Sequence, residues 1–120
     1  MLARIRRIAL SLPGAAEKIS HGRPAFYTTK IFAYYGGSVK VDNLWIQHDQ
    51  SIIVLLDPTE RRALLGDSRG YVPGYLGGYG WIGLDLANDQ VGWDEVGELI
   101  DSSYRSTSSK RLVAVLDSTR

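Results

Sequence analysis

The chain has 120 residues, 44% of them hydrophobic and 22% charged, and its net charge is +1, which is ordinary for a globular protein. It contains no cysteine, which excludes disulfides, thiol catalysis and cysteine-ligated zinc. No apolar run approaches the roughly 20 residues of a membrane-spanning helix, and the basic N-terminal segment lacks the uninterrupted apolar stretch of a secretory signal. We therefore expect a single cytoplasmic domain over residues 1–120, with no membrane partner.

The first half of the chain predicts one helix followed by three strands. Apolar residues recur at helical spacing over residues 2–12, and Pro13-Gly14 ends that helix. Runs rich in aromatic and β-branched residues then predict strands. The three predicted strands are 25–35, 38–47 and 51–56, separated by Gly36-Gly37 and by a joint around Asp49-Gln50.

The second half of the chain predicts helices on either side of a strand. Asp57 can cap free N–H groups and Pro58 suits the first helical position, so a helix is expected to begin there and to end near Gly66. Within residues 81–86, Trp81, Gly83 and Asp85 alternate with Ile82, Leu84 and Leu86, which predicts a strand with one apolar side. Helices are expected from Trp93 onward and over 110–116. Successive strands with short joints favour an α+β fold with a single antiparallel sheet covered on one face by helices.

Several sequence blocks occur in the order typical of one known family. These blocks are Leu12-Pro13-Gly14 with Glu17, His21-Gly22-Arg23-Pro24-Ala25-Phe26, Lys30-Ile31-Phe32-Ala33, Pro73-Gly74-Tyr75-Leu76-Gly77, Gly80-Trp81-Ile82, Trp93-Asp94-Glu95-Val96, Leu99-Ile100, Ser103-Tyr104-Arg105 and Lys110-Arg111-Leu112. As an ordered set they resemble the YjbR/MmcQ family, whose fold is similar to that of the iron-associated frataxin/CyaY proteins. The resemblance implies a CyaY-like fold and DNA binding through a double-wing arrangement.

The chain departs from this resemblance in two places. Many relatives carry a basic residue before the Gly-Trp pair, where this chain reads Gly77-Gly78-Tyr79-Gly80. The segment 36–50 is longer and contains the acidic Asp42. Both departures reduce the positive charge that DNA phosphates would meet.

Basic residues supply the first part of a candidate nucleic-acid site. Arg23 and Lys30 flank a short strand that starts at Pro24, and an arginine fork can hold phosphate oxygens. The alternative interpretation is that Arg23 pairs with Glu17 and organises the turn before the strand. The full set of candidate nucleic-acid-binding residues is Arg23, Lys30, Tyr75, Tyr79, Trp81, Lys110 and Arg111.

Aromatic residues supply the second part. The segment 71–81 places three tyrosines and a tryptophan among four glycines, and such rings can stack on bases as they do in single-strand binders. One alternative is that Tyr75 and Trp81 fold onto the core. Another is that this wing forms a concave apolar site for a small ligand or a protein partner.

No catalytic or metal-binding set can be assembled from the sequence. His21 and His48 are the only histidines, and neither has the partners of a base–nucleophile pair or a metal-ligand spacing. Asp94, Glu98 and Asp101 share one helical face, where carboxylates at a helix start are also stabilised by the helix dipole. We therefore expect a non-catalytic protein without a cofactor or a metal, and His21 in a turn.

Overall fold

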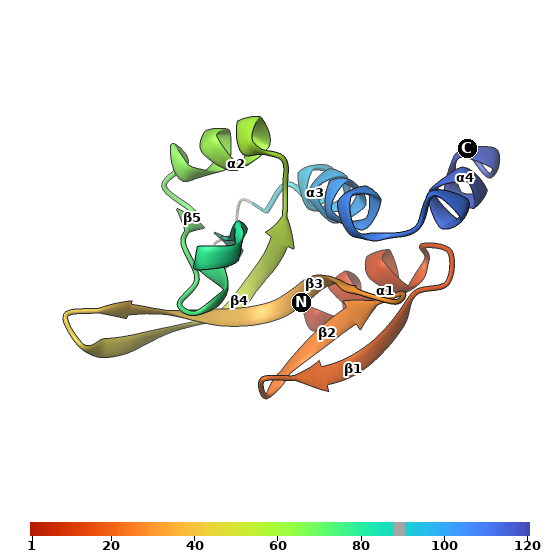
Figure 1. Ribbon diagram of the computed structural model, residues 1–120. Coiled ribbons are helices and arrows are strands. Elements are labelled where there is room, and N and C mark those ends of the chain that lie inside the picture. The colour runs from red at the N-terminus through yellow and green to blue at the C-terminus, as the bar shows by residue number, and fades with distance from the viewer. Residues whose placement is uncertain (88–90) are drawn as a thin grey trace.

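The computed structural model describes residues 1–87 and 91–120 and contains one antiparallel sheet with strand order β1-β2-β3-β4-β6-β5 (Figure 1). The strands are β1 (Ala16–Ser20), β2 (Arg23–Tyr27), β3 (Ile31–Val41), β4 (Leu44–Leu55), β5 (Gly70–Tyr71) and β6 (Trp81–Asp85). The helices are α1 (Leu2–Leu10), α2 (Pro58–Leu65), the 3-10 turn η1 (Leu76–Tyr79), α3 (Trp93–Thr107) and α4 (Lys110–Ser118). The predicted α+β class, with helices packed on one face of a single antiparallel sheet, is confirmed.

One face of the sheet, called here the helix face, holds the main core. Side chains of a strand alternate between faces, so every second residue of each central strand points toward α1, α2 and α3. The buried residues of this core are Ile5, Ala9, Leu12, Phe26, Phe32, Ala33, Ile52, Val54, Leu56, Leu64, Ile82, Leu84, Leu86, Val96, Ile100, Tyr104 and Leu116. The predicted apolar side of residues 81–86 is therefore confirmed, because Ile82, Leu84 and Leu86 all belong to it.

A buried serine fixes α3 to the middle of the sheet. The Ser103 hydroxyl donates to the backbone oxygen of Phe32 on β3 (2.5 Å) and accepts from the backbone N–H of Leu55 on β4 (2.8 Å). The next residue, Tyr104, donates its hydroxyl to the backbone oxygen of Pro13 (2.6 Å). Ser103 and Tyr104 thus connect α3 to both central strands and to the segment after α1.

The predicted strand over 25–35 is wrong, because the chain reverses within it. The backbone N–H of Thr28 bonds to the oxygen of Lys30 (3.1 Å), and β2 and β3 pair on either side of this turn. The turn contains neither glycine nor proline, so composition did not reveal it. β1, which the sequence did not predict, pairs with β2 across a turn at His21 and Gly22, both with positive φ (53° and 75°). The expected turn position of His21 is confirmed.

The predicted boundaries at Gly36-Gly37 and Asp49-Gln50 are also wrong. β3 runs through the first with only a register irregularity, and β4 is continuous from Leu44 to Leu55. The reversal lies at Asp42-Asn43, whose positive φ values (51° and 65°) suit a two-residue hairpin turn. The hairpin over 38–47, called here the arm, projects beyond the rest of the sheet (Figure 1), and the molecule measures 46 × 27 × 26 Å.

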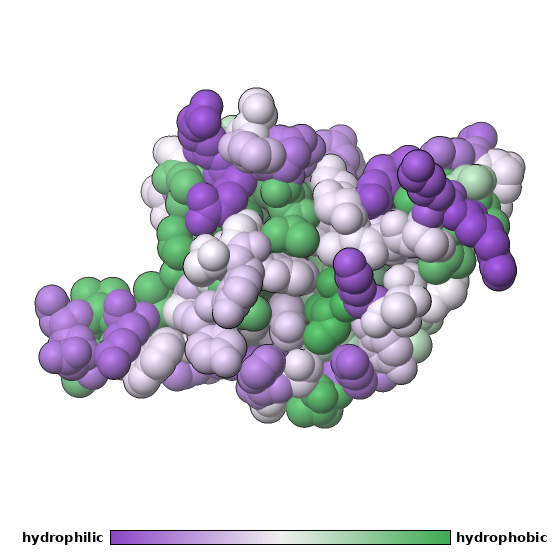
Figure 2. Space-filling model, in the orientation of Figure 1, coloured by the Kyte–Doolittle hydropathy of each residue, from purple (hydrophilic) through white to green (hydrophobic). Residues whose placement is uncertain are grey.

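The two sides of the arm differ in chemistry. Residues paired across an antiparallel ladder share a side, so Val39 and Ile46 lie with Val41 and Leu44 on an aliphatic side, whereas Lys40 lies with Trp45 on the other. Figure 2 shows this apolar surface among hydrophilic atoms at the projecting end. The aliphatic side has no partner among the described residues, and Leu44 is 70% exposed.

The helices of the second half agree with the sequence. Asp57 accepts a hydrogen bond from the Glu60 N–H (2.8 Å) and Pro58 is the first residue of α2, which ends at Leu65 before Gly66. α3 begins at Trp93, and α4 runs two residues beyond its predicted end, to Ser118. No helix among the described residues is long and apolar enough to cross a membrane.

The opposite face of the sheet, called here the open face, has a smaller apolar cluster. Ala25, Tyr34 and Ile53 are buried there, and Tyr71, Leu76 and Trp81 pack against them with Ile31. Tyr71, Leu76 and Trp81 come from the segment that contains β5, η1 and β6, so this segment covers only one end of the open face. The remaining surface, toward β1 and the arm, is where the candidate site lies.

Candidate functional site

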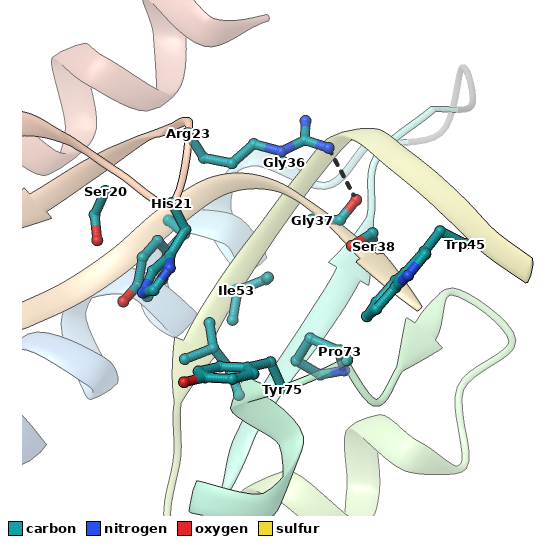
Figure 3. A pocket seen from close by; sticks show the side chains of 13 residues that line it. Ser20, His21, Arg23, Gly36, Gly37, Ser38, Trp45, Ile53, Pro73 and Tyr75 are labelled. Atoms are coloured by element: carbon teal, nitrogen blue, oxygen red, sulfur yellow. Dashed lines mark hydrogen bonds between the residues drawn. The ribbon is translucent and has the colours of Figure 1, made fainter. Parts of the chain in front are cut away.

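A cleft of about 160 Å³ opens on the open face where three segments meet (Figure 3). The first is the end of β1 with its turn to β2, the second is β3 at the base of the arm, and the third is the loop before η1. The lining residues are Ser20, His21, Arg23, Tyr34, Gly36, Gly37, Ser38, Trp45, Ile53, Pro73, Gly74, Tyr75 and Leu76. Figure 3 shows His21 and Tyr75 toward one end of the cleft and Trp45 toward the other.

Tyr75 is held in a strained backbone conformation at the mouth of the cleft. Its φ and ψ are 71° and −58°, and the Leu76 N–H donates to the Gly74 oxygen (2.8 Å), which is the geometry of a γ-turn of the rare, strained kind. The side chain is 80% exposed, and its ring centroid lies 5.9 Å from that of His21. The strain, about 1–3 kcal/mol for such a residue, is not offset by burial of the ring. A strained, exposed ring beside a cleft is typical of a ligand contact.

Arg23 ties β2 to the base of the arm. Its Nη1 donates to Asp49 Oδ1 (2.8 Å), and its Nη2 donates to Gln47 Oε1 (2.5 Å) and to the Gly37 backbone oxygen (3.3 Å). The interpretation that Arg23 pairs with Glu17 is therefore wrong. Glu17 accepts two hydrogen bonds from Arg6 instead (2.5 and 2.8 Å), and these hold the pKa of Glu17 below its usual value.

Two lysines that the sequence did not single out flank the cleft on the open face. Lys18 pairs across the ladder with Ala25 and lies on the same face, with its Nζ 4.6 Å from the Tyr27 ring centroid. Lys40 shares the side of Trp45, and its Nζ lies 5.9 Å from that ring. Neither lysine forms an ion pair with the described residues. Since Asp49 offsets Arg23, these lysines supply the excess positive charge beside the cleft.

The glycines around Tyr75 make room for the protein's own rings. A Cβ on Gly74 would lie 2.5 Å from the Trp45 ring, and one on Gly83 would collide with the Tyr71 ring. One on Gly77 would collide with Val72. Close packing between β5, η1, β6 and the arm therefore requires glycine at these three positions.

The structure divides the predicted binding residues into two groups. Arg23 and Tyr75 both line the cleft. Lys30 lies in the turn at the opposite end of β2, and that turn contacts the junction of α3 and α4, where Thr28 Oγ1 is 3.4 Å from Ser108 Oγ. Lys110 and Arg111 follow this junction in the first turn of α4. Arg23 and Lys30 are therefore not brought together.

The other two predicted aromatics lie outside the cleft. Tyr79, at the end of η1, is 76% exposed. Trp81 packs edge to face on Tyr34, with centroids 5.4 Å apart and an interplanar angle of 74°. Trp81 therefore folds onto the open-face cluster, as one of the sequence alternatives stated, whereas Tyr75 remains exposed.

The second histidine, on β4 directly after the arm, contacts β6. His48 Nδ1 is 2.7 Å from Asp85 Oδ2, and its ring stacks on Tyr71 with centroids 4.1 Å apart. Burial raises the pKa of Tyr71 to about 12. Burial also acts to raise the pKa of Asp85, but the hydrogen bonds from His48 and from the Ala87 N–H outweigh this effect, so the pKa of Asp85 is lowered. The Ser51 hydroxyl donates to the backbone oxygen of His48 (2.8 Å), not to its ring. These contacts hold β4 against β6 and against Tyr71 of β5.

Of the three acidic residues predicted to share a face of α3, only Asp101 forms ion pairs with the described residues. Asp101 pairs with Arg105 of the next helical turn (2.9 Å), and Arg105 also pairs with Asp117 of α4 (2.9 Å). Within residues 1–87 and 91–120, no group of three His, Asp or Glu side chains is placed to hold a metal ion. The pair between Arg105 and Asp117 therefore joins α3 to α4.

The fold is that of a small α+β protein whose antiparallel sheet keeps one face open around a cleft. A family model described as YjbR matches residues 10–106, and the chain belongs to the YjbR family. The match covers all six strands, the cleft and most of α3, and it ends before α4. The family predicted from the ordered blocks is thus confirmed. No curated protein matches the chain.

Proposed function

We propose that the protein is a non-catalytic module that binds single-stranded nucleic acid, and DNA in particular, across the open face. The cleft receives a base, and Lys18, Arg23 and Lys40 lie beside the phosphates. The observation that carries the proposal is Tyr75, an exposed ring kept at the cleft mouth despite a strained backbone. Base–aromatic stacking contributes about 1–3 kcal/mol per base, which gives such a ring a use.

The distribution of charge favours a single strand over a duplex. Duplex DNA carries one negative charge per about 1.7 Å of axis, which calls for a long, strongly basic surface. The open face offers two lysines that form no ion pair with any described residue, together with Arg23, whose charge Asp49 already offsets. A few cations beside exposed rings suit a flexible strand with unstacked bases.

The first test is salt-dependent binding of a labelled oligothymidylate, measured by fluorescence anisotropy. We expect binding at about 50 mM salt, with log K falling against log salt at a slope of about −1.4, since each of the two phosphates neutralised by Lys18 and Lys40 contributes about −0.7. Absence of binding to single-stranded and duplex DNA at this salt concentration would refute the proposal.

Two double variants with equal charge change locate the binding face. Lys18→Ala/Lys40→Ala should reduce the slope by about 1.4 and weaken binding. Lys110→Ala/Arg111→Ala, which removes the same charge from the start of α4, should leave both unchanged. The reverse pattern would assign binding to the α3–α4 end of the molecule.

Two tyrosine variants test stacking at the cleft. Tyr75→Ala should lower the affinity by about 1–3 kcal/mol, whereas Tyr79→Ala, which removes an equally exposed ring outside the cleft, should have a smaller effect. Equal losses would show that exposure alone, and not the cleft, determines binding.

The second candidate function is a small-ligand module that uses the same cleft. The buried Tyr34 and Ile53, 6% and 3% exposed, give the cleft an apolar floor of the kind found in ligand sites. Thermal-shift screening against metabolites separates the candidates, because a neutral ligand would stabilise the protein equally at low and high salt, whereas nucleic acid would not.

A further inference from the structure

His21 brings a titratable side chain to the mouth of the cleft. It is exposed in the turn between β1 and β2, it lines the cleft, and its ring centroid lies 5.9 Å from that of Tyr75 (Figure 3). Within residues 1–87 and 91–120 its ring makes no hydrogen bond and no ion pair, whereas the other histidine, His48, is bonded to Asp85. The imidazole of His21 is therefore open to a ligand that stacks on Tyr75.

The titratable groups that share the cleft with His21 are basic or phenolic. Arg23 comes from β2, Tyr34 from β3 and Tyr75 from the loop before η1, and no carboxylate belongs to the described lining. Lys18, on the same face of β1, adds a further cation. A positive charge on His21 would therefore meet no anion of the protein there, and the phosphate of a bound strand would supply the missing partner.

Two carboxylates on neighbouring strands, Glu17 of β1 and Asp49 of β4, are engaged with arginines. Asp49 accepts a hydrogen bond from Arg23 (2.8 Å), and Glu17 accepts from Arg6. Neither lines the cleft. The pairing of Asp49 with Arg23 also reduces the repulsion between the guanidinium and a protonated His21.

Histidine is the only side chain that in its ordinary state changes charge between about pH 5 and pH 8. The chain has two histidines and no cysteine. We infer that His21 contacts a phosphate of the bound strand when its imidazole is protonated, so that the cleft binds single-stranded nucleic acid more tightly at mildly acidic pH. This inference rests on the proposed function and adds a proton-dependent contact to it.

Oligothymidylate binding at two pH values tests the inference, because thymine and phosphodiester groups keep their charge over this range. At about pH 8 we expect a salt slope of about −1.4, from Lys18 and Lys40. At about pH 5.5 we expect about −2.1, since one more neutralised phosphate contributes about −0.7. At about 50 mM salt this additional exponent corresponds to an affinity about eightfold higher.

Matched substitutions at the two histidines identify the group responsible. His21→Asn, which suits the positive φ of this residue (53°), should bind with the same affinity at both pH values. His48→Asn should retain the eightfold change, because His48 is bonded to Asp85 outside the cleft. His21→Arg carries a permanent charge and should bind at both pH values about as tightly as the wild type does at about pH 5.5. Circular dichroism would confirm that the variants fold.

Proton linkage gives a second measurement of the same coupling. Because coupling between two bound species is reciprocal, an eightfold change in affinity requires the NMR titration midpoint of the His21 ring protons to rise by about 0.9 pH units when oligothymidylate is bound. The ring protons of His48, followed in the same spectra, are the internal control and should keep their midpoint.

The outcomes separate the inference from the function on which it rests. Affinity that is independent of pH, or a pH dependence that survives in His21→Asn, overturns the inference and leaves the proposed function standing. A pH dependence that disappears in His48→Asn instead also overturns it. Absence of oligonucleotide binding at both pH values refutes the function and the inference together. An eightfold change that is lost in His21→Asn and retained in His48→Asn supports the inference.

Discussion

The two faces of the sheet are made by the same strands, yet they differ in how their side chains are held. On the helix face, Phe32 and Ile52 are fully buried beneath α3, and the polar Ser103 has both its partners. On the open face, Tyr34 and Ile53 are buried beneath Tyr71, Leu76 and Trp81 but border the cleft, and Tyr75 stays exposed with a strained backbone. The helix face is therefore packed for stability, whereas the open face keeps Tyr75 exposed beside the cleft.

The largest difference between the faces should appear when neighbouring rings of β3 are truncated. Phe32→Ala creates an enclosed cavity and should cost about 3–5 kcal/mol. Tyr34→Ala borders the open cleft, so little enclosed cavity forms and the cost should be smaller by at least about 1 kcal/mol. Urea unfolding of both variants measures this difference. Equal costs would contradict the distinction between the faces.

The buried serine should give the next largest effect. Ser103→Ala leaves the Leu55 N–H and the Phe32 oxygen without partners beneath α3, and should cost about 2–4 kcal/mol. Ser106→Ala, in the next turn of α3, removes only an exposed hydrogen bond to Ser102 and should change the free energy of unfolding by less than about 0.5 kcal/mol. A cost below 1 kcal/mol for the first variant, by the same urea measurement, would argue that Ser103 does not fix α3.

Replacing Tyr75 with glycine should increase stability, whereas the substitutions above decrease it. Tyr75→Gly relieves the positive-φ strain and loses little burial, so it should raise the free energy of unfolding by about 1 kcal/mol. The same variant should bind oligothymidylate less tightly than the wild type. A loss of stability would instead show that the ring packs onto the fold and serves a structural purpose.

The smallest effect concerns an ion pair within the loop that connects α2 to β5, between Asp67 and Arg69. Hydrogen bonds from Arg69 lower the pKa of Asp67 to about 2, from an ordinary value of 3.8. A lowered pKa stabilises the fold above the unfolded-state value, and this contribution disappears as the pH falls from about 4 to about 2. The carboxylate is 32% exposed, so solvent screening keeps the effect below about 1 kcal/mol.

The variant Asp67→Asn tests the direction of this pH dependence of stability. The variant should be slightly less stable than the wild type at pH 6, and the difference should shrink as the pH falls toward 2. Denaturant unfolding at several pH values measures it. A difference that is constant with pH would show that the loss comes from changed geometry and not from the charge of Asp67.

The elements that local signals specify could be predicted from the sequence. Asp57 and Pro58 determine the start of α2 through contacts within one helical turn, and alternation specifies the faces of β6. The turn at Thr28–Lys30 could not be predicted in this way, since its residues carry no turn signal. Gly36 and Gly37 looked like breaks, but a side chain there would collide with Arg23 or Ile53. Those contacts exist only once the sheet has formed.

The candidate site was predictable to a similar extent. Tyr75 and Arg23 were found because aromatic and arginine residues are chemically distinctive, and both line the cleft. Lys18 and Lys40 were missed because their placement depends on strand pairing. β1 was not recognised as a strand, and Lys40 meets Trp45 only if the chain reverses at Asp42-Asn43. Pairing register is a long-range property that composition does not report.

The position of Trp45 on the arm has a spectroscopic consequence. The chain has three tryptophans, and each lies in a different environment: Trp45 is 53% exposed at the cleft, Trp81 packs on Tyr34, and Trp93 lies under the Arg4 guanidinium. A chain in which only Trp45 remains would emit from the arm alone. Its emission maximum would follow the hydration of the cleft without an attached dye, and energy transfer from nearby tyrosines would report changes in the angle between arm and sheet.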